Sequence, residues 1–400
     1  MDEPSARPET RPWVRPVALA AAAVLVLGVI ITYALSRPSS WKRSGPPATV
    51  SGWAPYWQTD SAYASFAANR AAFIDVSLFA YHATAADAVE PYDGLGADVP
   101  NQYRAAVRGA GARFTATIVD DTPSGTMAGI LAHKTSRALH VQTIVSFAET
   151  GGFDGIDLDY EKFAFSDSRK TWKGTRPNWV AFVTELAHAL HAKGKTLTVS
   201  APPSGDYWVY DYEAMGKVVD AIRIMAYDYS TARAGPVAPI KWVRNVVSSA
   251  KKLVPDNKLV LGVPVYGYDW PVVLAGTCPG GDADQPKRRS VSTKSAAALA
   301  ASKNVAPTWN AEAAERTFAY TDVLSGLDQA GVATSCTVAH TVWYSDAEAV
   351  HDRAWLAERQ GLAGIALWSL GSEDDLVWQA IAAARADQGD WPATTQLTAG

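Results

Sequence analysis

The stretch GFDGIDLDYEK, residues 152–162, decides how this chain folds. Within it, Asp157, Asp159 and Glu161 alternate with large apolar residues. Because successive side chains of a strand point to opposite faces, the three acids share one face. Collecting three carboxylates costs free energy through desolvation and mutual repulsion, and acids that were merely solvated would not need this alternation. The pattern therefore predicts a buried strand whose acidic face carries chemistry.

A calcium-binding loop is an alternative for this spacing of acids. An EF-hand loop beginning at Asp157 would need a glycine at its sixth position and a glutamate at its twelfth. Those positions hold Lys162 and Ser168. The seven histidines show no metal-ligand spacing, and His188 and His191 lie three apart on a predicted helix that also carries charge. We therefore expect no metal and no cofactor.

Short apolar runs recur along the chain, and each is followed by a helix-like stretch. Residues 178–193, for example, read NWVAFVTELAHALHAK, with apolar side chains at helical spacing and Gly194 as a stop. Eight strands alternating with helices over about 330 residues predict an α/β fold, the (β/α)₈ TIM barrel. A doubly wound open sheet, which usually has fewer strands, is the alternative. The predicted strands cover residues 50–56, 74–80, 113–119, 155–159, 196–200, 221–227, 259–265 and 364–369.

The connection between the seventh and eighth predicted strands is too long for a single helix. It runs from Tyr266 to Val342 and contains both cysteines of the chain, Cys278 and Cys336. We expect a small inserted subdomain over about residues 270–342, on the loop face where barrel active sites lie. Outside the cytosol the two cysteines can form a disulfide, worth at most ~4 kcal/mol in the chain-entropy model. Two unpaired buried thiols are the alternative.

An uncharged apolar segment precedes the barrel. Residues 17–35 read VALAAAAVLVLGVIITYAL, and a helix of this length spans roughly 28 Å, close to the ~30 Å hydrocarbon core of a bilayer. Arg7, Arg11 and Arg15 precede it, so the positive-inside rule leaves residues 1–16 in the cytoplasm. We expect a retained single-pass membrane anchor with the rest of the chain outside. A cleaved signal peptide followed by secretion is the alternative, although its apolar region is normally only about 7–15 residues long. The remaining predicted parts are a linker rich in Pro and Ser (36–49), the barrel (50–385) and a polar tail (386–400).

The composition is that of a globular chain and excludes several classes of protein. Hydrophobic residues make up 48% and charged residues 19%, which rules out a disordered chain, a collagen and a coiled coil. The net charge of −4 argues against a nucleic-acid partner, whose usual binder carries a basic patch. The 15 Trp and 16 Tyr are either core residues or rings that can stack on sugar faces.

The acidic strand resembles the D-x-x-D-x-D-x-E signature of family 18 glycoside hydrolases, the chitinase-like barrel enzymes. Asp154, Asp157, Asp159 and Glu161 match its four acidic positions. They also lie on the fourth predicted strand, which is where the family carries the signature. The resemblance extends over about residues 50–384 and therefore implies the same barrel fold.

Other stretches support the resemblance and narrow it. Residues 225–228 read MAYD and are similar to the family's M-x-Y-D, and Trp368 falls where the family has the aromatic floor of its sugar site. Chitinases of the family often carry S-x-G-G on strand three, whereas residues 114–121 read FTATIVDD. Together with YGYDW at 266–270 and VWYSD at 342–346, this resembles the branch of bacterial spore-cortex and cell-wall lytic glucosaminidases.

The resemblance implies a retaining hydrolysis in which the 2-acetamido oxygen of the substrate is the nucleophile. Glu161 would be the proton donor and later the general base. Asp159 would bind the acetamido N–H, and Asp157 would share a proton or a hydrogen bond with Asp159. Crowding of the carboxyls keeps one of them protonated near neutral pH. Tyr227 would bind the acetamido carbonyl, and Asp228 would assist it. The remaining substrate-binding candidates are Asp154, Met225, Trp368, Tyr266 and Trp53.

Several of these residues also have structural interpretations. Trp53 could line the cleft, but core packing is equally consistent with its position in the first predicted strand. Tyr266 lies at the top of the seventh predicted strand together with Tyr268 and Trp270, where we favour contact with sugar. Asp120 and Asp121, which follow the third predicted strand on the active face, are weaker candidates.

The predicted function is hydrolysis of β-1,4-linked N-acetylglucosamine-containing glycans outside the cytoplasm, with peptidoglycan or chitin as the polymer partner. A catalytically silent, lectin-like barrel that only binds glycans is the alternative. Relatives of that kind usually lose the acid glutamate, which is present here as Glu161. Cleavage within the chitobiose core of N-glycans is a third possibility.

Overall fold

The structure, a computed structural model, describes residues 49–386. Its centre is a ring of eight parallel strands in the order β1-β14-β8-β7-β6-β5-β4-β2, closed by pairing of β1 with β2. This closure confirms the predicted (β/α)₈ barrel and excludes the open sheet. The strands are β1 (Thr49–Pro55), β2 (Phe73–Ala85), β4 (Arg113–Asp120), β5 (Gly155–Asp159), β6 (Thr196–Ala201), β7 (Ala221–Ile224), β8 (Leu259–Pro264) and β14 (Gly364–Trp368).

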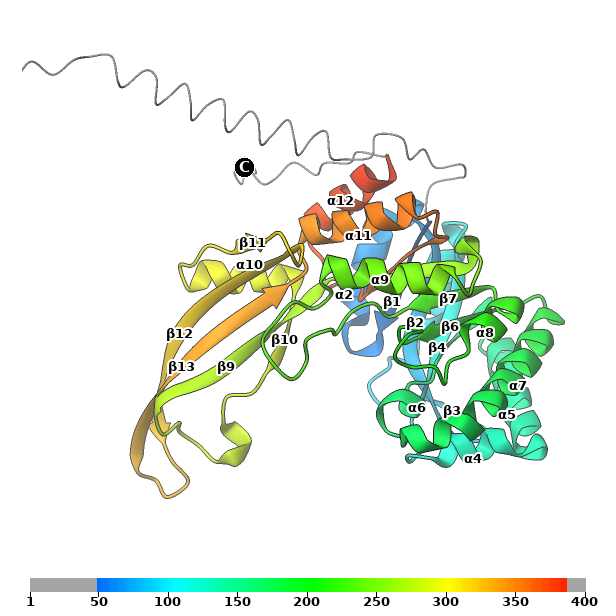
Figure 1. The fold of residues 1–400 in the computed structure, drawn as a ribbon, viewed down its shortest axis with the longest axis horizontal. Coiled ribbons are helices and arrows are strands. Elements are labelled where there is room, and N and C mark those ends of the chain that lie inside the picture. Colours follow the sequence, from blue (N-terminus) through cyan, green and yellow to red (C-terminus); the bar gives the residue numbers. More distant parts are fainter. Residues whose placement is uncertain (1–48, 387–400) are drawn as a thin grey trace, which may run out of the picture. The chain divides into compact units, whose positions relative to one another are not determined.

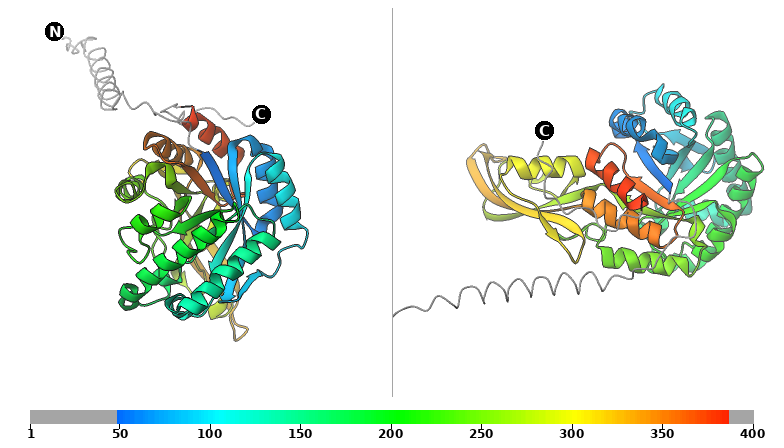
Figure 2. Two further views of the ribbon diagram at one scale, coloured as in Figure 1. Left: turned by 90° about the vertical axis from the view of Figure 1, so that its right-hand side faces the viewer. Right: turned by 90° about the horizontal axis from the view of Figure 1, so that it is seen from above.

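Helices surround the ring, as Figure 1 and Figure 2 show. The predicted helix 178–193 is part of α7, which begins six residues earlier, at Trp172, and ends at His191. A short strand, β3 (Ala88–Pro91), forms a hairpin with β2. The other helices of the barrel are α2 (Thr59–Asn69), α3 (Val99–Gly109), α4 (Thr126–Ala132), α5 (Lys134–Thr150), α6 (Lys162–Phe165), α8 (Tyr212–Val218), α9 (Ile240–Lys251), α11 (Ala347–Arg359) and α12 (Asp375–Arg385).

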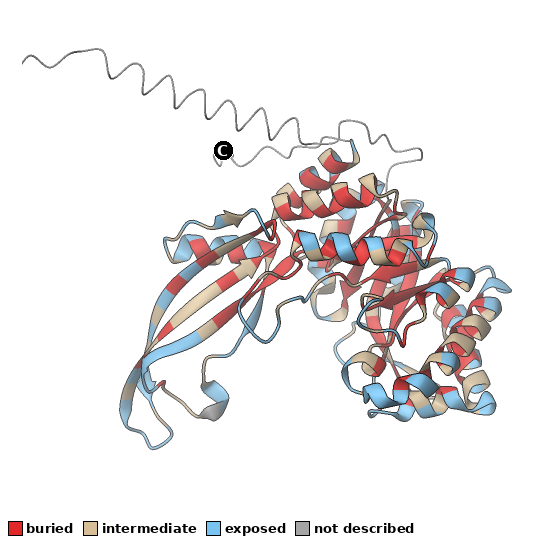
Figure 3. Cartoon of the chain, in the orientation of Figure 1, coloured by how far each residue is buried: buried red, intermediate tan, exposed pale blue. Residues whose placement is uncertain are grey.

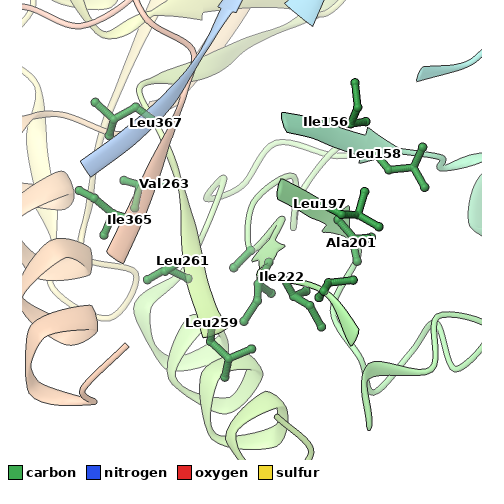
Figure 4. Packing of buried hydrophobic residues seen from close by; sticks show 14 of the residues in the cluster. Ile156, Leu158, Leu197, Ala201, Ile222, Leu259, Leu261, Val263, Ile365 and Leu367 are labelled. Carbon is green, nitrogen blue, oxygen red and sulfur yellow. The ribbon is translucent and has the colours of Figure 1, made fainter. Parts of the chain in front are cut away.

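The hydrophobic core lies between the ring and these helices. Ile156 and Leu158 of β5 are fully buried on its helix-facing side, and their neighbours on β6 and β7 include Leu197 and Ile222 (Figure 4). Both faces of the ring strands are buried (Figure 3), as is usual for parallel sheets covered by helices. Because side chains alternate, the residues between these apolar positions point into the lumen.

The chain between β8 and α11 forms an inserted subdomain. It is a five-stranded antiparallel sheet in the order β10-β9-β13-β12-β11, with α10 (Thr293–Ser302) packed against it. The sheet begins at Tyr266 and ends at Tyr344, so it is slightly longer than the predicted 270–342. Figure 1 shows it to one side of the barrel. Its strands are β9 (Tyr266–Gly276), β10 (Arg289–Ser292), β11 (Thr308–Asn310), β12 (Glu315–Leu327) and β13 (Ala333–Tyr344).

A disulfide joins Cys278 to Cys336 in this subdomain. Both sulfur-bearing residues are buried beside Val338, where they form a small apolar cluster with Leu324. The predicted pairing is therefore confirmed, and the alternative of two free thiols is excluded.

The predicted location in a membrane needs correction. No helix among residues 49–386 is long and apolar enough to cross a bilayer. The segment 17–35, on which the predicted anchor fell, lies outside the described residues. So do residues 1–16 and almost all of the predicted linker and tail.

Candidate active site

Asp157 is the innermost of the three acids at 157, 159 and 161, and none of its side chain is exposed. Its carboxylate accepts hydrogen bonds from Trp53 Nε1 (2.7 Å), Thr117 Oγ1 (3.0 Å) and Ser200 Oγ (2.9 Å). Nη1 of Arg223 lies 3.2 Å from its Oδ2. These partners come from β1, β4, β6 and β7, so the carboxylate lies inside the ring.

Arg223 is a buried cation that two acids share. Besides Asp157, its guanidinium binds Oδ1 of Asp75 on β2, which also accepts a hydrogen bond from Thr115 at 3.1 Å. Burial lowers the pKa of Arg223, but the charges of Asp157 and Asp75 outweigh burial and raise it overall. The guanidinium therefore stays charged and balances the deepest carboxylates of the lumen.

Asp159 and Glu161 form a pair of carboxyl groups that lies closer to the carboxyl end of β5 than the ion pair of Asp157 and Arg223. Burial, followed by the charges of Glu161 and Asp157, raises the pKa of Asp159 well above its usual value. Burial raises the pKa of Glu161 to about 7; the hydrogen bond from Asp159 opposes this and the charge of Asp228 adds to it. Their side chains share a hydrogen bond, so the pair holds a proton near neutral pH. Oδ1 of Asp159 is buried and has no hydrogen-bond partner within residues 49–386.

Asp228 follows β7, which is separated from β5 by one strand of the ring. Its backbone is left-handed, with φ of 58°, a conformation that costs a residue with a side chain roughly 1–2 kcal/mol and that Asp tolerates better than most. The hydroxyls of Tyr266 and Tyr268 both donate to its Oδ1, the latter at 2.8 Å. Burial, followed by the charges of Asp159, Glu161 and Asp228, raises the pKa of Tyr227, so its phenol stays a hydrogen-bond donor.

Two hollows meet at Asp228. The larger one, of about 660 Å³, is bordered by Glu161, Met225 and Tyr227. The smaller one, of about 260 Å³, contains Trp368 and Tyr266. Aromatic rings line both hollows, and such rings suit the apolar faces of sugars. In the larger hollow these rings are Phe165, Tyr207, Tyr229 and Trp242, and in the smaller one they include Trp57 and Tyr268.

Most of the predicted site residues thus come together at the carboxyl ends of the barrel strands. They are Asp157, Asp159, Glu161, Met225, Tyr227, Asp228, Tyr266 and Trp368. Trp53 also belongs to the site, but only 1% of it is exposed. Its Nε1 donates to Asp157, and its ring centroid lies 5.7 Å from that of Trp368. It therefore supports the acids and packs beneath Trp368.

Asp154 is not brought to the site. It precedes the first residue of β5, a strand roughly 16 Å long, and so lies at the opposite end from Glu161. Its carboxylate binds Arg108 Nε at 3.1 Å and the backbone N–H of Phe114 at 2.9 Å. These contacts join the start of β5 to α3 and β4. The predicted role of Asp154 in substrate binding is replaced by a structural one.

Arg223 and its partner Asp75 are site residues that the sequence analysis did not identify. Arg223 sits between Ile222 and Ile224, both fully buried on the helix-facing side. The same alternation that placed Asp157 in the lumen therefore also places Arg223 there. The signal was present in the sequence, but an arginine within a short apolar strand looks like an exposed edge residue until the ring is known to be closed.

The closed barrel and the carboxyl pair at the carboxyl ends of its strands define a glycoside hydrolase. Residues 54–374 match the model of Glycosyl hydrolases family 18, and the chain belongs to this family.

Similar proteins agree with this assignment. The chain is 25% identical over 259 residues to an uncharacterized glycosylase, YvbX, of Bacillus subtilis (63% of this chain, 67% of the relative). It is 28% identical over 252 residues to the cortical fragment-lytic enzyme of the same organism, covering 60% of this chain but only 52% of that relative. Among solved structures, a chitinase from Chromobacterium violaceum is 27% identical, with a TM-score of 0.68 over 85% of this chain and 99% of that one. The spore cortex-lytic enzyme SleL of Bacillus cereus shares the fold at 22% identity (TM-score 0.68, 85% of this chain, 75% of that one).

Proposed function

We propose that this chain hydrolyses β-1,4-linked N-acetylglucosamine-containing glycans, peptidoglycan or chitin, by a retaining, substrate-assisted mechanism. The observation that carries the proposal is the hydrogen-bonded pair of Asp159 and Glu161, with Glu161 bordering the larger hollow. A carboxyl group with a pKa of about 7 that reaches a sugar-sized cleft is suited to protonate a leaving group near neutral pH.

In the first step, Glu161 gives its proton to the glycosidic oxygen while the bond from that oxygen to the anomeric carbon breaks. The acetamido oxygen of the same sugar forms the new bond to that carbon, and a positively charged cyclic intermediate results. Asp159 accepts the acetamido N–H through Oδ1, which has no hydrogen-bond partner among the described residues, and offsets the positive charge. Water then attacks the anomeric carbon while the bond from that carbon to the acetamido oxygen breaks, and it gives its proton to Glu161. This restores the acid and the acetamido group and retains the configuration.

The arrangement of the other carboxylates supports a nucleophile supplied by the substrate. In the usual glycosidase pair the two carboxyls flank the scissile bond. Asp159 and Glu161 instead lie two residues apart on one stretch of chain, and their side chains share a hydrogen bond, so they do not flank a bond from opposite sides. Asp157 is buried against Arg223, and Asp228 is bound by two tyrosine hydroxyls. Asp157 and Asp228 therefore already have partners in the protein. Neither is free to act as a nucleophile on the face of the sugar opposite Glu161.

The named relatives point to both polymers. They include cortical fragment-lytic enzymes, a probable endochitinase and a chitinase. This chain spans about half the length of the cortical fragment-lytic relatives, so their whole activity is carried over only as part of the proposal. A glycan-binding barrel without activity is disfavoured because Glu161 is present with a raised pKa beside Asp159.

The test is to incubate the protein with N-acetylglucosamine oligomers and with purified peptidoglycan and to identify the products by mass spectrometry. We expect cleavage of at least one polymer, and a β-anomer as the first product by NMR. Glu161→Gln serves as the inactive control. Cleavage of neither polymer, or an inverted first product, would contradict the proposal.

A further inference from the structure

Tyr160, the residue between Asp159 and Glu161, makes one hydrogen bond through its side chain and another through its backbone. Its side chain is fully buried on the helix-facing side of the barrel. Its hydroxyl lies 2.7 Å from Nε2 of His140, which belongs to α5. Its backbone carbonyl accepts a hydrogen bond of 2.6 Å from the hydroxyl of Tyr210. One contact therefore fixes the side chain and the other fixes the backbone.

The network assigns a direction to the contact between Tyr160 and His140. Nδ1 of His140 lies 3.1 Å from the carbonyl oxygen of Ala86, which can only accept, so Nδ1 carries the hydrogen. A neutral imidazole has a single N–H, so Nε2 accepts from the Tyr160 hydroxyl. Burial lowers the pKa of His140 to about 4, and the hydrogen bond to Ala86 only partly opposes this. The imidazole is therefore neutral at neutral pH.

The side chain of Tyr160 is enclosed by other rings and by a buried acid. Its ring stacks on Phe182 of α7 at 6.1 Å and lies 6.1 Å from the ring of Trp179. The acid that faces it from β4 is Asp120, which is 2% exposed and whose charge, after burial, raises the pKa of Tyr160. Tyr210 faces the same acid, as well as Glu161 and Asp159. Both tyrosines therefore stay protonated and keep their roles as donors.

These contacts occur at the point where strand pairing ends. The last residue of β5 with a partner in the ladder is Asp159, opposite Val119. Glu161 lies two residues further along, outside the ladder, and its carbonyl accepts hydrogen bonds from the backbone N–H groups of Ala164 and Phe165 in α6. The two hydrogen bonds of Tyr160 hold the chain at this point. They join Tyr160 to α5 through His140 and to the segment before α8 through Tyr210.

We propose that His140 and Tyr210 position Glu161 through Tyr160. The three residues form a clamp that sets the place of the acid relative to Asp159, and none of them touches substrate. The proposal rests on the proposed function, in which Glu161 is the acid. A displacement of about 1 Å at a reacting group can cost 10²-fold in rate, so the clamp has a measurable effect on catalysis although it lies behind the strand.

The test compares Tyr160→Phe, Tyr210→Phe and His140→Leu with a matched control, Tyr103→Phe. Tyr103 is likewise a buried tyrosine, in α3, whose hydroxyl makes one hydrogen bond, of 2.6 Å, to the carbonyl of Thr59. We expect the three clamp variants to lose about tenfold to hundredfold in kcat with little change in KM, and the control to keep its kcat. Folding of each variant is checked by circular dichroism and thermal unfolding.

Two further measurements separate positioning from a loss of stability. His140→Gln should recover most of the kcat lost in His140→Leu, because an amide can donate to Ala86 and accept from Tyr160. The clamp variants should also move the basic limb of the pH profile upward. The hydrogen bond from Asp159 lowers the pKa of Glu161, and a displaced Glu161 loses that bond.

The outcomes distinguish this proposal from the proposed function. If Tyr160→Phe lowers only the melting temperature, as Tyr103→Phe does, and keeps both kcat and the pH limb, the clamp has no positioning role. In that case an inactive Glu161→Gln still leaves the proposed function standing. If Glu161→Gln itself turns over substrate normally, the function fails and the positioning proposal fails with it.

Discussion

Nη1 of Arg223 lies 3.2 Å from Oδ2 of Asp157, and the same guanidinium binds Asp75 on the opposite part of the ring. No more than 3% of the arginine side chain is exposed. One buried cation therefore faces two buried carboxylates. Arg223 therefore neutralises Asp157 and Asp75 but not Asp159 or Glu161, which have no cation of their own among the described residues. This is why Asp159 and Glu161 share a proton.

Replacing Arg223 by methionine should cost about 3–5 kcal/mol in the free energy of unfolding, because two charges would stay buried without their cation. Urea denaturation at pH 7 measures this. Arg113→Met is the matched control: its Nε is 3.6 Å from Asp75, but 49% of its side chain is exposed, so we expect less than about 1 kcal/mol. Equal losses in the two variants would show that burial of the ion pair is unimportant.

Glu161→Gln should lower kcat by about 10²–10⁴-fold and leave glycan binding intact, because the amide keeps the shape of the side chain but cannot donate an acidic proton. Turnover of N-acetylglucosamine oligomers and calorimetric binding measure the two effects. Glu149→Gln, at an exposed ion pair with Lys193 at the end of α5, should leave both unchanged. Near-normal turnover by Glu161→Gln would show that another group is the acid.

The pH profile should report on Glu161. An acid is active while protonated, so kcat/KM should be high below its pKa and fall as the pH rises through about 7. The charge of Asp228 raises the pKa of Glu161, so Asp228→Asn should move the falling limb to lower pH. Rate measurements across pH 4–9, a span of about 2–3 units on each side, test this. A limb that stays in place would mean that Asp228 does not act on the acid.

A thiazoline analogue of N-acetylglucosamine should inhibit strongly, because it mimics the cyclic intermediate and sites bind such species about 10²-fold or more tighter than substrate. A fully deacetylated polymer and a plain glucose polymer should not be cut, since neither can close the ring. Inhibition constants and product analysis provide the measurements. Efficient cleavage of the deacetylated polymer would mean that an enzyme carboxylate is the nucleophile.

The disulfide should stabilise the inserted subdomain without taking part in catalysis. It closes a separation of 58 residues, which in the chain-entropy model is worth at most ~4 kcal/mol. Replacing Cys278 and Cys336 together by alanine should lower the unfolding temperature and leave kcat unchanged, because neither residue borders the cleft. A loss of kcat in a folded double variant would show that the far part of the sheet affects the site.

Local patterns were sufficient to predict the ring and its acidic strand. The predicted 155–159 has the same bounds as β5, because alternation of acids and large apolar residues is a strong local signal. Strand β7 ends at Ile224, three residues before the predicted end. Its last predicted residues look apolar in the sequence, but they leave the ladder to bring Tyr227 and Asp228 to the cleft. The position at which β7 leaves the sheet depends on the contacts of Tyr227 and Asp228 in the site, and the periodicity of the sequence does not predict it.

Contacts between residues far apart in the chain could not be predicted from the sequence. Nothing local indicates that Trp53 donates to Asp157, which lies 104 residues away in the chain. The role of Asp154 was misjudged for a related reason: a motif gives the spacing of its acids, but only the length and direction of the strand show that its first acid lies at the opposite end. His140 carried no signal either, because its partner Tyr160 becomes a buried contact only when α5 packs on the barrel.

The position of the inserted sheet has a consequence for the order of events during synthesis. The strand that closes the ring, β14, pairs with both β1 and β8, and Gly364 stands opposite Thr49 at the beginning of the barrel. The ribosome must therefore produce the whole insertion before the last gap in the ring can be filled. Until then the edges of β1 and β8 expose unpaired backbone groups, which are prone to association. We expect the nascent chain to be most vulnerable to aggregation in this interval.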